Sequence, residues 1–349
     1  MKLTWVTVLA ATMLFLAGCG QNNDQAREEG KDAQAEVVWK AQSLWQAGTL
    51  PHQIFENFAQ RVTERSKGRL KIEALPVNTV VSSTESLDAV SAGILQAQHS
   101  GPGYFTGKDA AFALVGDPQG GFETPEQMRQ WLQEGGGLAL ARELYAHYNV
   151  FFVGGVWYGQ ESLVSKRPLR KLADFKGVKI RAPQGIGQDI FQILGAAPVN
   201  LPGSEVYTAL ERGVIDASDW GTLSMNQDLG YHKLAPYPNY PGFHSMPMAD
   251  FAVNMDAWNA LPDDLKALVE EEVGNFATEM VERNRAADER VLAKEKEEGF
   301  EAIDLPRDER RKFREIARGV WKEYAARSTM AQRVYDSQVA YLKKLNLLD

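Results

Sequence analysis

The sequence predicts an α/β fold of two lobes, joined by a hinge around a central cleft, with long helices at the carboxyl end. Short apolar segments alternate with amphipathic helical segments over most of the chain, which is typical of mostly parallel sheets covered by helices. A further apolar segment, residues 249–254, follows a second series of this kind, so we expect the chain to return to its first lobe. Beyond Pro262 the pattern is helical.

The first residues have the composition of an export signal. Lys2 precedes residues 3–18, an uncharged and mostly apolar run that is shorter than the about 20 residues of a membrane-spanning helix. Small residues lead into Cys19, a pattern typical of lipoprotein cleavage sites. We therefore expect residues 1–18 to be a signal peptide and Cys19 to carry a lipid that anchors the protein to a membrane on its periplasmic side. The alternative is an ordinary export signal with an incidental cysteine.

The segment that follows predicts a flexible tether, and the overall charge limits the partners. Residues 19–36 are polar and have no apolar stripe. The chain has a net charge of −8, which argues against binding to nucleic acid or to anionic lipid headgroups. A small anionic ligand is not excluded, because the local potential of a pocket can oppose the overall charge. Since Cys19 is the one cysteine, a hydrophobic core rather than disulfides must stabilise the fold.

The first lobe is expected over residues 37–157. Pro51 opens an amphipathic helix after the first strand, and Gly68 ends it. Strand and helix patterns alternate up to a loop-rich segment, residues 101–137, and a buried strand closes the lobe. The expected strands are residues 37–43, 70–74, 94–99 and 149–159, and the expected helices begin near residues 51, 83 and 125.

The second lobe is expected over residues 158–245, where shorter strands and helices alternate. A return segment, about residues 246–285, then leads back to the first lobe. Gly195 and Gly213 each close a helix of the second lobe. The expected strands are residues 162–165, 179–181 and 214–218, and the expected helices are residues 186–194 and 207–212.

Two long helical patterns, residues 262–298 and 306–345, follow the second lobe. The first is rich in Glu, Lys and Arg, which indicates a solvated helix face. We expect about residues 286–349 to pack on the second lobe. The apolar stripes could instead pair two subunits in a homodimer, and the sequence does not choose between these arrangements.

The motifs of common enzyme classes are absent from the sequence. It contains no Gly-x-Ser-x-Gly nucleophile turn, no phosphate-binding glycine loop and no thiol after Cys19. The five histidines lie far apart and not in zinc-site spacing. The sequence therefore favours a binding protein over an enzyme.

Arg181 is the first candidate binding residue. It stands at the end of a short strand pattern that Pro183 stops. A planar guanidinium binds a carboxylate through two parallel hydrogen bonds, and the glycine-rich residues 185–187 before a helix could add main-chain N–H groups. The alternative is a structural salt bridge with Asp216 or Glu211.

Asp219 is the second candidate, with Trp220 beside it. Both follow the strand pattern of residues 214–218, at the end where open α/β sheets bind ligands. A carboxylate there repels an anionic ligand, so either Asp219 accepts a hydrogen bond from a ligand hydroxyl or a cation lies between the negative groups. Hard cations such as Na⁺ and Ca²⁺ bind carboxylate, amide and carbonyl oxygens. The alternative role of Asp219 is to cap a helix that begins near Leu223.

Three segments in this order resemble the solute receptors of tripartite ATP-independent periplasmic (TRAP) transporters. They are "DFKGVKIRAPQG" (residues 174–185), "YTALERGVIDASDW" (207–220) and "VNMDAWNALP" (253–262), within a resemblance that covers about residues 37–345. It implies a periplasmic-binding-protein-like fold whose cleft closes on an organic acid, and delivery of that acid to membrane permease subunits.

Further segments are similar to the branch of this family that binds 2-oxo acids and related monocarboxylates with a metal ion. They are "SGPGYFTGKDAAFALVG" (residues 100–116), "EGGGLAL" (134–140) and Gly159-Gln160. The resemblance implies that Arg181 pairs with the ligand carboxylate and that Tyr104 borders the ligand. It implies a bridging Na⁺ or Ca²⁺ ion at Gln160, Asp219 and the main-chain carbonyl of Trp220.

The sequence departs from that branch in three places. Asp219 stands where many relatives carry glutamate, and residues 182–184 differ from the usual glycine-rich continuation. Residues 243–246 replace an aromatic-and-glutamate segment, so that His244 is either a polar ligand contact or a solvent-exposed loop residue. These departures leave the metal and the exact acid open.

The function we expect is that of a lipid-anchored receptor for a small monocarboxylate, a 2-oxo or 2-hydroxy acid, which it delivers to a TRAP permease. One alternative keeps the same scaffold but binds a dicarboxylate or a sugar acid without a metal. The other is a periplasmic enzyme that uses Asp219 or Asp216 as a base.

Overall fold

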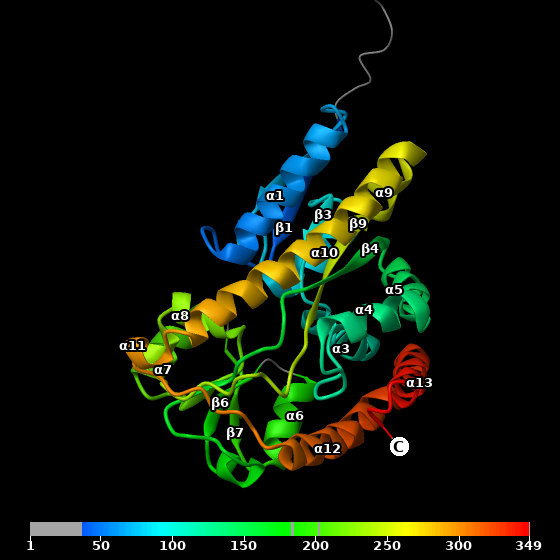
Figure 1. Ribbon diagram of the computed structural model, residues 1–349. Helices are drawn as coiled ribbons and strands as arrows, with labels where there is room; N and C mark the ends of the chain where they lie inside the picture. The colour runs from blue at the N-terminus through cyan, green and yellow to red at the C-terminus, as the bar shows by residue number, and fades with distance from the viewer. Residues whose placement is uncertain (1–36, 183–184, 202, 349) are drawn as a thin grey trace, which may run out of the picture. The chain divides into compact units, whose positions relative to one another are not determined.

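The computed structural model describes residues 37–182, 185–201 and 203–348. The expected signal peptide, Cys19 and the tether lie outside these described residues. The described chain is an α/β fold with two separate sheets, as the sequence predicts (Figure 1). None of its described helices is both long enough and apolar enough to cross a bilayer.

The larger sheet forms lobe I and has the strand order β2-β1-β3-β9-β4. β1 pairs in parallel with β2 and β3, whereas β9 pairs antiparallel with β3 and β4. Four of the five strands therefore run in the same direction, as expected of a mostly parallel sheet, and β9 runs the opposite way because the chain re-enters the sheet from the other end. Its strands are β1 (Val37–Ser43), β2 (Leu70–Leu75), β3 (Ala97–His99), β4 (Val150–Trp157) and β9 (Met248–Asn254).

Helices cover this sheet, and the apolar face of the first helix, α1, is wholly buried. The ring centres of Phe55 and Phe58 of α1 lie 5.9 and 5.0 Å from that of Phe276 in the core. Two helices, α3 and α5, form in or just after the segment expected to be loop-rich, and α5 starts behind Gly136 in a left-handed conformation (φ 87°). The helical elements are α1 (Leu50–Arg65), η1 (Ser83–Glu85), α2 (Ser86–Ser91), η2 (Pro102–Phe105), α3 (Ala111–Gly116), α4 (Pro125–Glu134) and α5 (Gly137–Ala146).

The smaller sheet forms lobe II and has the strand order β5-β8-β6-β7. β6 pairs in parallel with β7 and β8, so the carboxyl ends of β6 and β8 lie at one edge. The strands are β5 (Val164–Ser165), β6 (Lys179–Arg181), β7 (Ala197–Val199) and β8 (Ala217–Ser218). The helical elements are η3 (Leu172–Phe175), α6 (Ile186–Ile193), η4 (Gly203–Glu205), α7 (Val206–Glu211), α8 (Leu223–Asp228) and η5 (Tyr231–Lys233).

Two crossing segments, residues 158–163 after β4 and residues 240–247 before β9, run between the sheets. The Glu161 main-chain N–H donates to the Ser245 carbonyl at 3.1 Å, so the two segments lie side by side. Gly242 makes this approach feasible, because a Cβ atom at that position would overlap the Glu161 carbonyl.

The long helix α10 (Asp263–Leu292), which follows α9 (Met255–Asn259), makes a third connection. It packs on β4 and α1, where the buried Glu272 carboxylate pairs with Arg61 and Arg65 at 2.8 and 2.5 Å. Its other end reaches α8, where Asp288 accepts a hydrogen bond from the Ser224 main-chain N–H at 2.7 Å. The helix is therefore anchored in both lobes (Figure 1).

The last two helical patterns are each broken once. Residues 262–298 form α10 and α11 (Glu295–Glu298), and residues 306–345 form α12 (Arg307–Ala325) and α13 (Thr329–Lys344). Ser328 causes the second break: its hydroxyl accepts from the Ala331 N–H at 3.0 Å, as a helix cap does, and donates to Asp109 at 2.7 Å.

This break changes the expected placement of residues 286–349. α12 packs on α6 of lobe II but also on α3, and α13 packs on α3 and α5 of lobe I. The carboxyl end thus does not pack on the second lobe alone, because the turn at Ser328 redirects the chain toward lobe I.

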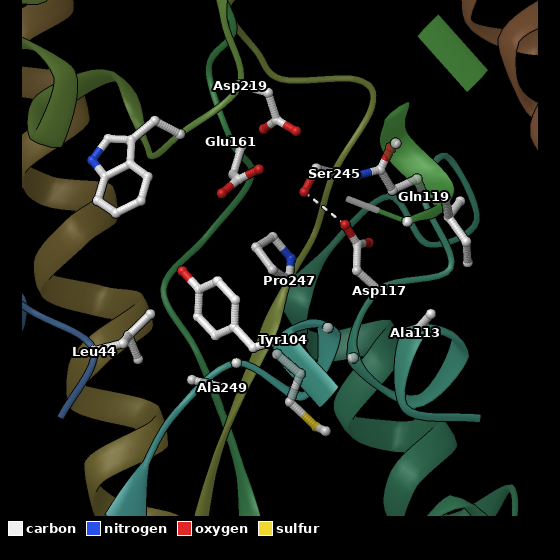
Figure 2. A pocket seen from close by; sticks show the side chains of 18 of the residues that line it. Leu44, Tyr104, Ala113, Asp117, Gln119, Glu161, Asp219, Ser245, Pro247 and Ala249 are labelled. Carbon is white, nitrogen blue, oxygen red and sulfur yellow. Dashed lines mark hydrogen bonds between the residues drawn. The ribbon is translucent and has the colours of Figure 1, made fainter. Parts of the chain in front are cut away.

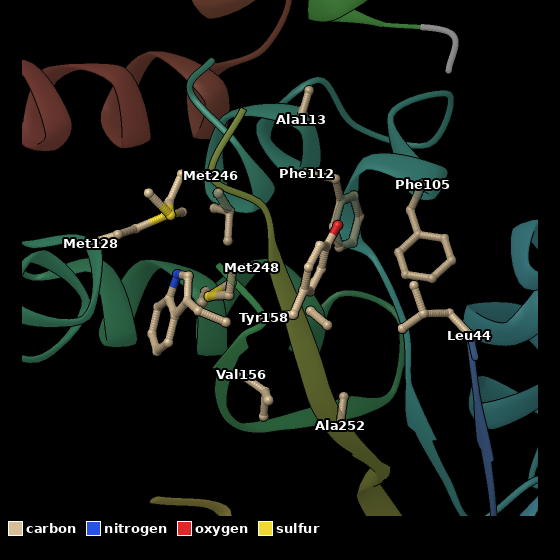
Figure 3. Close-up of a cluster of buried hydrophobic side chains, with 14 of the residues drawn as sticks. Leu44, Phe105, Phe112, Ala113, Met128, Val156, Tyr158, Met246, Met248 and Ala252 are labelled. Atoms are coloured by element: carbon tan, nitrogen blue, oxygen red, sulfur yellow. The ribbon is translucent and has the colours of Figure 1, made fainter. Parts of the chain in front are cut away.

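A cluster of buried apolar side chains lies in lobe I next to the cleft. Figure 3 shows Met246 and Met248 of the returning segment near Tyr158 and Phe112, with Leu44 at the edge. Because these side chains are packed among the strands and α3, they give the polar groups above them a fixed support.

Candidate functional site

A small cavity lies where the two sheets and the crossing segments meet (Figure 2). It measures about 130 Å³ and is called here the inner chamber. Four residues predicted from the sequence line it: Tyr104 of η2, Arg181 at the end of β6, and Asp219 and Trp220 after β8. Since the carboxyl ends of parallel strands share one edge, the pairing of β6 with β8 brings Arg181 and Asp219 together.

Arg181 is a buried cation that lacks a carboxylate partner. Its side chain is 4% exposed, and no carboxylate of the described residues lies within 4.0 Å of it. Its Nε–H donates to the Leu201 carbonyl at 3.1 Å and its Nη1 to the Asp219 carbonyl, which leaves three of the five guanidinium N–H groups for other acceptors. The salt bridge with Asp216 is not formed, because the Asp216 carboxylate accepts from the Lys179 main-chain N–H at 3.1 Å.

Trp220 fixes the guanidinium from one side. The Arg181 Cζ lies 5.2 Å from the centre of the indole ring, within the range of a cation–π contact. The indole in turn lies against Gly203, where a Cβ atom would overlap the ring. The absence of a side chain at Gly203 thus keeps Trp220 beside Arg181.

Asp219, Glu161 and His244 form a buried cluster at the back of the inner chamber. Ligand atoms of the three side chains all lie within 4.8 Å of one another. His244 Nε2 is 3.1 Å from Asp219 Oδ1 and 4.0 Å from Glu161 Oε2. His244 is fully buried, so it is not the solvent-exposed loop residue that the sequence left open. Figure 2 shows the Glu161 and Asp219 carboxylates close together above Tyr104.

The two carboxyl groups of this cluster differ in ionisation. Burial raises the pKa of Glu161 well above its ordinary value, and the Asp219 charge raises it further. Burial also favours a higher pKa for Asp219, but His244, Glu161 and Arg181 outweigh it and hold the pKa of Asp219 below its ordinary value. The pair therefore carries a proton on Glu161 and a negative charge on Asp219.

The cluster has the donor atoms that a hard cation requires. Asp219 Oδ2 and His244 Nδ1 are buried and have no partner among the N–H and hydroxyl groups of the described residues, although the protonated Glu161 carboxyl group hydrogen-bonds to Asp219. A buried carboxylate oxygen without a partner is costly, and a cation or a ligand hydroxyl would satisfy it. Asp219 and Glu161 supply oxygen ligands of the kind that Ca²⁺ and Na⁺ take, so these residues fit the implied metal.

Gln160 lies apart from this cluster. Its Nε2 donates to the Glu123 carbonyl at 2.8 Å, and the residue is not among those lining the inner chamber. Its neighbour Glu161 points into the chamber instead, and Tyr158 Oη donates to Glu161 Oε1 at 3.0 Å. Sequence reasoning missed Glu161, although its position just after a buried strand was the available signal.

A second protonatable carboxyl group, Asp117, lines the opposite wall. Ser245 Oγ donates to it at 2.7 Å and the Met246 N–H at 3.2 Å, which links the end of α3 to the returning segment. Burial raises the pKa of Asp117 to about 7.

Asp219 does not cap α8, the alternative role considered from the sequence. The first residue of α8 follows Thr222, and the Ser224 N–H donates to Asp288 instead.

Comparison with known proteins identifies the family. The model of the bacterial extracellular solute-binding proteins, family 7 (DctP), matches residues 41–328. The chain belongs to this family. The DctP family comprises extracellular solute-binding proteins rather than enzymes, so this chain is a solute-binding protein.

Individual relatives resemble this DctP protein over nearly their whole length. A monocarboxylate 2-oxoacid-binding periplasmic protein of Nostoc sp. is 29% identical over 339 residues, 97% of this chain and 92% of that one. A TRAP periplasmic solute-binding protein of Rhodobacter sphaeroides, in an apo open structure, is 40% identical over 89% of this chain and 99% of that chain, with a TM-score of 0.75. One of Colwellia psychrerythraea, with bound calcium and pyruvate, is 28% identical over 89% and 96%, with a TM-score of 0.81. The two-lobed TRAP receptor fold is thus confirmed.

Proposed function

We propose that this TRAP receptor binds a small monocarboxylate, a 2-oxo or 2-hydroxy acid, and that Arg181 binds the carboxylate group. The observation that carries the proposal is the buried Arg181 guanidinium, which has no carboxylate within 4.0 Å in the described chain. An isolated buried charge is costly unless an opposite charge compensates it. A ligand carboxylate would supply that charge through two parallel hydrogen bonds.

The size of the inner chamber supports a short ligand head. Its volume of about 130 Å³ is well below the roughly 300–1,000 Å³ of pockets that hold drug-sized molecules. Leu44, Ala113 and Met248 contribute apolar surface to the wall, and Tyr104 stands beside the acid cluster. These side chains suit a short carbon chain with one polar end.

We further propose that Asp219 and Glu161 hold a Ca²⁺ or Na⁺ ion together with the 2-oxo or 2-hydroxy oxygen of the ligand. A Ca²⁺ ion would balance the charge of both carboxylates, a Na⁺ ion would balance one of them, and either would attract the ligand oxygen. Glu161 releases its proton when it becomes a ligand. Of the metal ligands predicted from the sequence, the Trp220 main-chain carbonyl remains a candidate ligand. The Gln160 side-chain amide would first have to break its hydrogen bond with the Glu123 carbonyl.

Calorimetry on protein that has been unfolded, dialysed and refolded to remove any bound ligand tests the proposal. Pyruvate and lactate are titrated with calcium, with sodium, and with a chelator in sodium-free buffer. We expect binding of at least one acid in the micromolar range, about −8 kcal/mol, and a weaker affinity with the chelator. If neither acid nor any close 2-oxo or 2-hydroxy homologue binds under any condition, the ligand class is wrong.

A metal-free acid receptor is the second candidate, and His244 is the observation that favours it. Its Nε2 is 3.1 Å from Asp219 Oδ1, so the imidazole can hold the Asp219 carboxylate through a hydrogen bond without a cation. Equal affinity for pyruvate with calcium and with chelator would support this candidate over the metal site.

The cellular arrangement is also proposed from the sequence. We propose that a lipid on Cys19 anchors the receptor on the periplasmic side, where it delivers its ligand to TRAP permease subunits. Metabolic labelling with a fatty acid, lost in Cys19→Ser, checks the anchor. A homodimer through α12 and α13 would be detected as a doubled mass in analytical ultracentrifugation.

A further inference from the structure

A second and larger cavity adjoins the inner chamber. It measures about 630 Å³ and is called here the outer chamber. Leu44, Tyr104, Arg181 and Trp220 line both chambers, so the guanidinium of Arg181 stands at the boundary between them. A ligand whose carboxylate is bound by Arg181 can therefore extend into the outer chamber.

The two chambers differ in charge. Asp117, Glu161 and Asp219 line the inner chamber, whereas no aspartate or glutamate is among the described residues that line the outer chamber. The outer chamber instead has two guanidinium groups, Arg181 and Arg327. In a protein with a net charge of −8, such a cavity favours an anion.

Arg327 is held at this cavity by its neighbours. Its Cζ lies 3.6 Å from the ring centre of Tyr324, and Tyr324 Oη donates to Asp189 Oδ2 at 2.9 Å. Arg327 Nη2 is 4.0 Å from the same carboxylate, at the limit of an ion pair, and the Arg327 side chain is 49% exposed. An ion pair of this length between exposed groups is weak, which leaves the guanidinium available to a ligand.

The break between α12 and α13 puts Arg327 in this position. α12 ends at Ala325 with Ala326 as its C-cap, and Ser328 caps α13, so Arg327 lies in the turn between the two helices rather than within a continuous helix. Hydroxyl and amide side chains line the rest of the outer chamber, among them Asn78, Ser83 and Asn200. They can supply hydrogen bonds to a polar chain, and apolar residues such as Val77 and Leu201 lie beside them, so the two guanidinium groups are what distinguish a charged tail from an apolar one.

We infer that the outer chamber is a second subsite, which takes the far end of a longer 2-oxo acid and binds a terminal carboxylate through Arg327. The inference rests on the proposed function, because it requires Arg181 to bind the first carboxylate, and it extends the ligand class from 2-oxo monocarboxylates to 2-oxo acids with a second, terminal carboxylate. It makes Arg327 a specificity-determining residue for chain length and tail charge.

A matched pair of ligands tests the inference. 2-Oxoglutarate and 2-oxopentanoate have the same chain length and differ at the far end, which is a carboxylate in one and a methyl group in the other. For the unmodified protein we expect 2-oxoglutarate to bind about tenfold more tightly in calorimetry. For Arg327→Gln we expect that preference to disappear, while the affinities for 2-oxopentanoate and pyruvate stay within about twofold.

Arg311→Gln is the matched control, because it removes the same charge from α12 at an exposed position that lines neither chamber. It should keep the preference for 2-oxoglutarate. The inference is overturned if 2-oxoglutarate binds no more tightly than 2-oxopentanoate, or if the preference survives in Arg327→Gln. Failure of the proposed function looks different, because then none of the three 2-oxo acids binds to any of the proteins.

Discussion

Replacing Arg181 with methionine is the most direct test of the site, because methionine keeps much of the side-chain length and removes the charge. A charge-assisted hydrogen bond contributes about 1.5–3 kcal/mol, and a carboxylate bound in parallel makes two of them. The loss of about 3–6 kcal/mol corresponds to an affinity for pyruvate about 10²- to 10⁴-fold weaker.

The fold should tolerate this change. The carbonyls of Leu201 and Asp219 lose their donor, which costs about 1–3 kcal/mol each, while removal of an unpaired buried charge offsets that cost. We therefore expect cooperative thermal unfolding that is displaced by a few degrees. Lys179→Met is the control, because it removes a charge from the same strand at a position that lines neither chamber. If Arg181→Met binds pyruvate within tenfold of the control in calorimetry, Arg181 is not the carboxylate partner.

Two substitutions near Arg181 and one pH titration supply further tests. Glu161→Gln should lower the calcium-dependent part of the pyruvate affinity at least tenfold. It should also raise the free energy of unfolding at pH 8 by about 1 kcal/mol, because a neutral amide replaces a buried acid. If the calcium dependence in calorimetry is unchanged, Glu161 is not a ligand of the cation. Gly203→Ala should weaken pyruvate binding more than tenfold, because the added methyl group displaces the indole beside it. Gly319→Ala, at an exposed position of α12 with open space around its Cβ and outside both chambers, should bind normally. Equal affinities of the two variants would contradict the packing argument. Burial raises the folded-state pKa of Asp117 and Asp250 to about 7 from an ordinary value of 3.8, so the folded protein retains protons that the unfolded chain releases. Urea titrations should therefore show the free energy of unfolding falling between about pH 4 and pH 7, by up to about 1.4 kcal/mol per pH unit for each group. Above about pH 7 the contribution of these two groups should not change further. Stability that instead rises over this range would show that the two groups are ionised in the folded protein.

Arg181 could be predicted because its signals are local. A short strand pattern, a proline that stops it and a guanidinium at its end are all read from a few consecutive residues. The elements of both lobes were predictable for the same reason, and β1 and β6 have the expected bounds. The family resemblance placed Asp219 and Trp220 beside Arg181, as the structure does.

Glu161 and His244 were not predictable in the same way. A carboxylate near an anion site is unfavourable in itself, and the arrangement becomes reasonable only because Glu161 holds a proton beside Asp219. The burial of His244 arises from contacts with residues distant in sequence, which leave no periodic pattern in a crossing segment. The break at Ser328 has the same origin, since its partner Asp109 lies in lobe I.

The α10 helix sets how an empty receptor can differ from a loaded one. Its start is tied to α1 through Glu272, and its end is tied to α8 through Asp288. Separation of the lobes must therefore curve the helix between these two ties or detach one of them. The rate of amide hydrogen exchange along residues 273–287 should then report whether a ligand is bound. Exchange should be slow when a ligand holds the lobes together and faster when the ligand has dissociated.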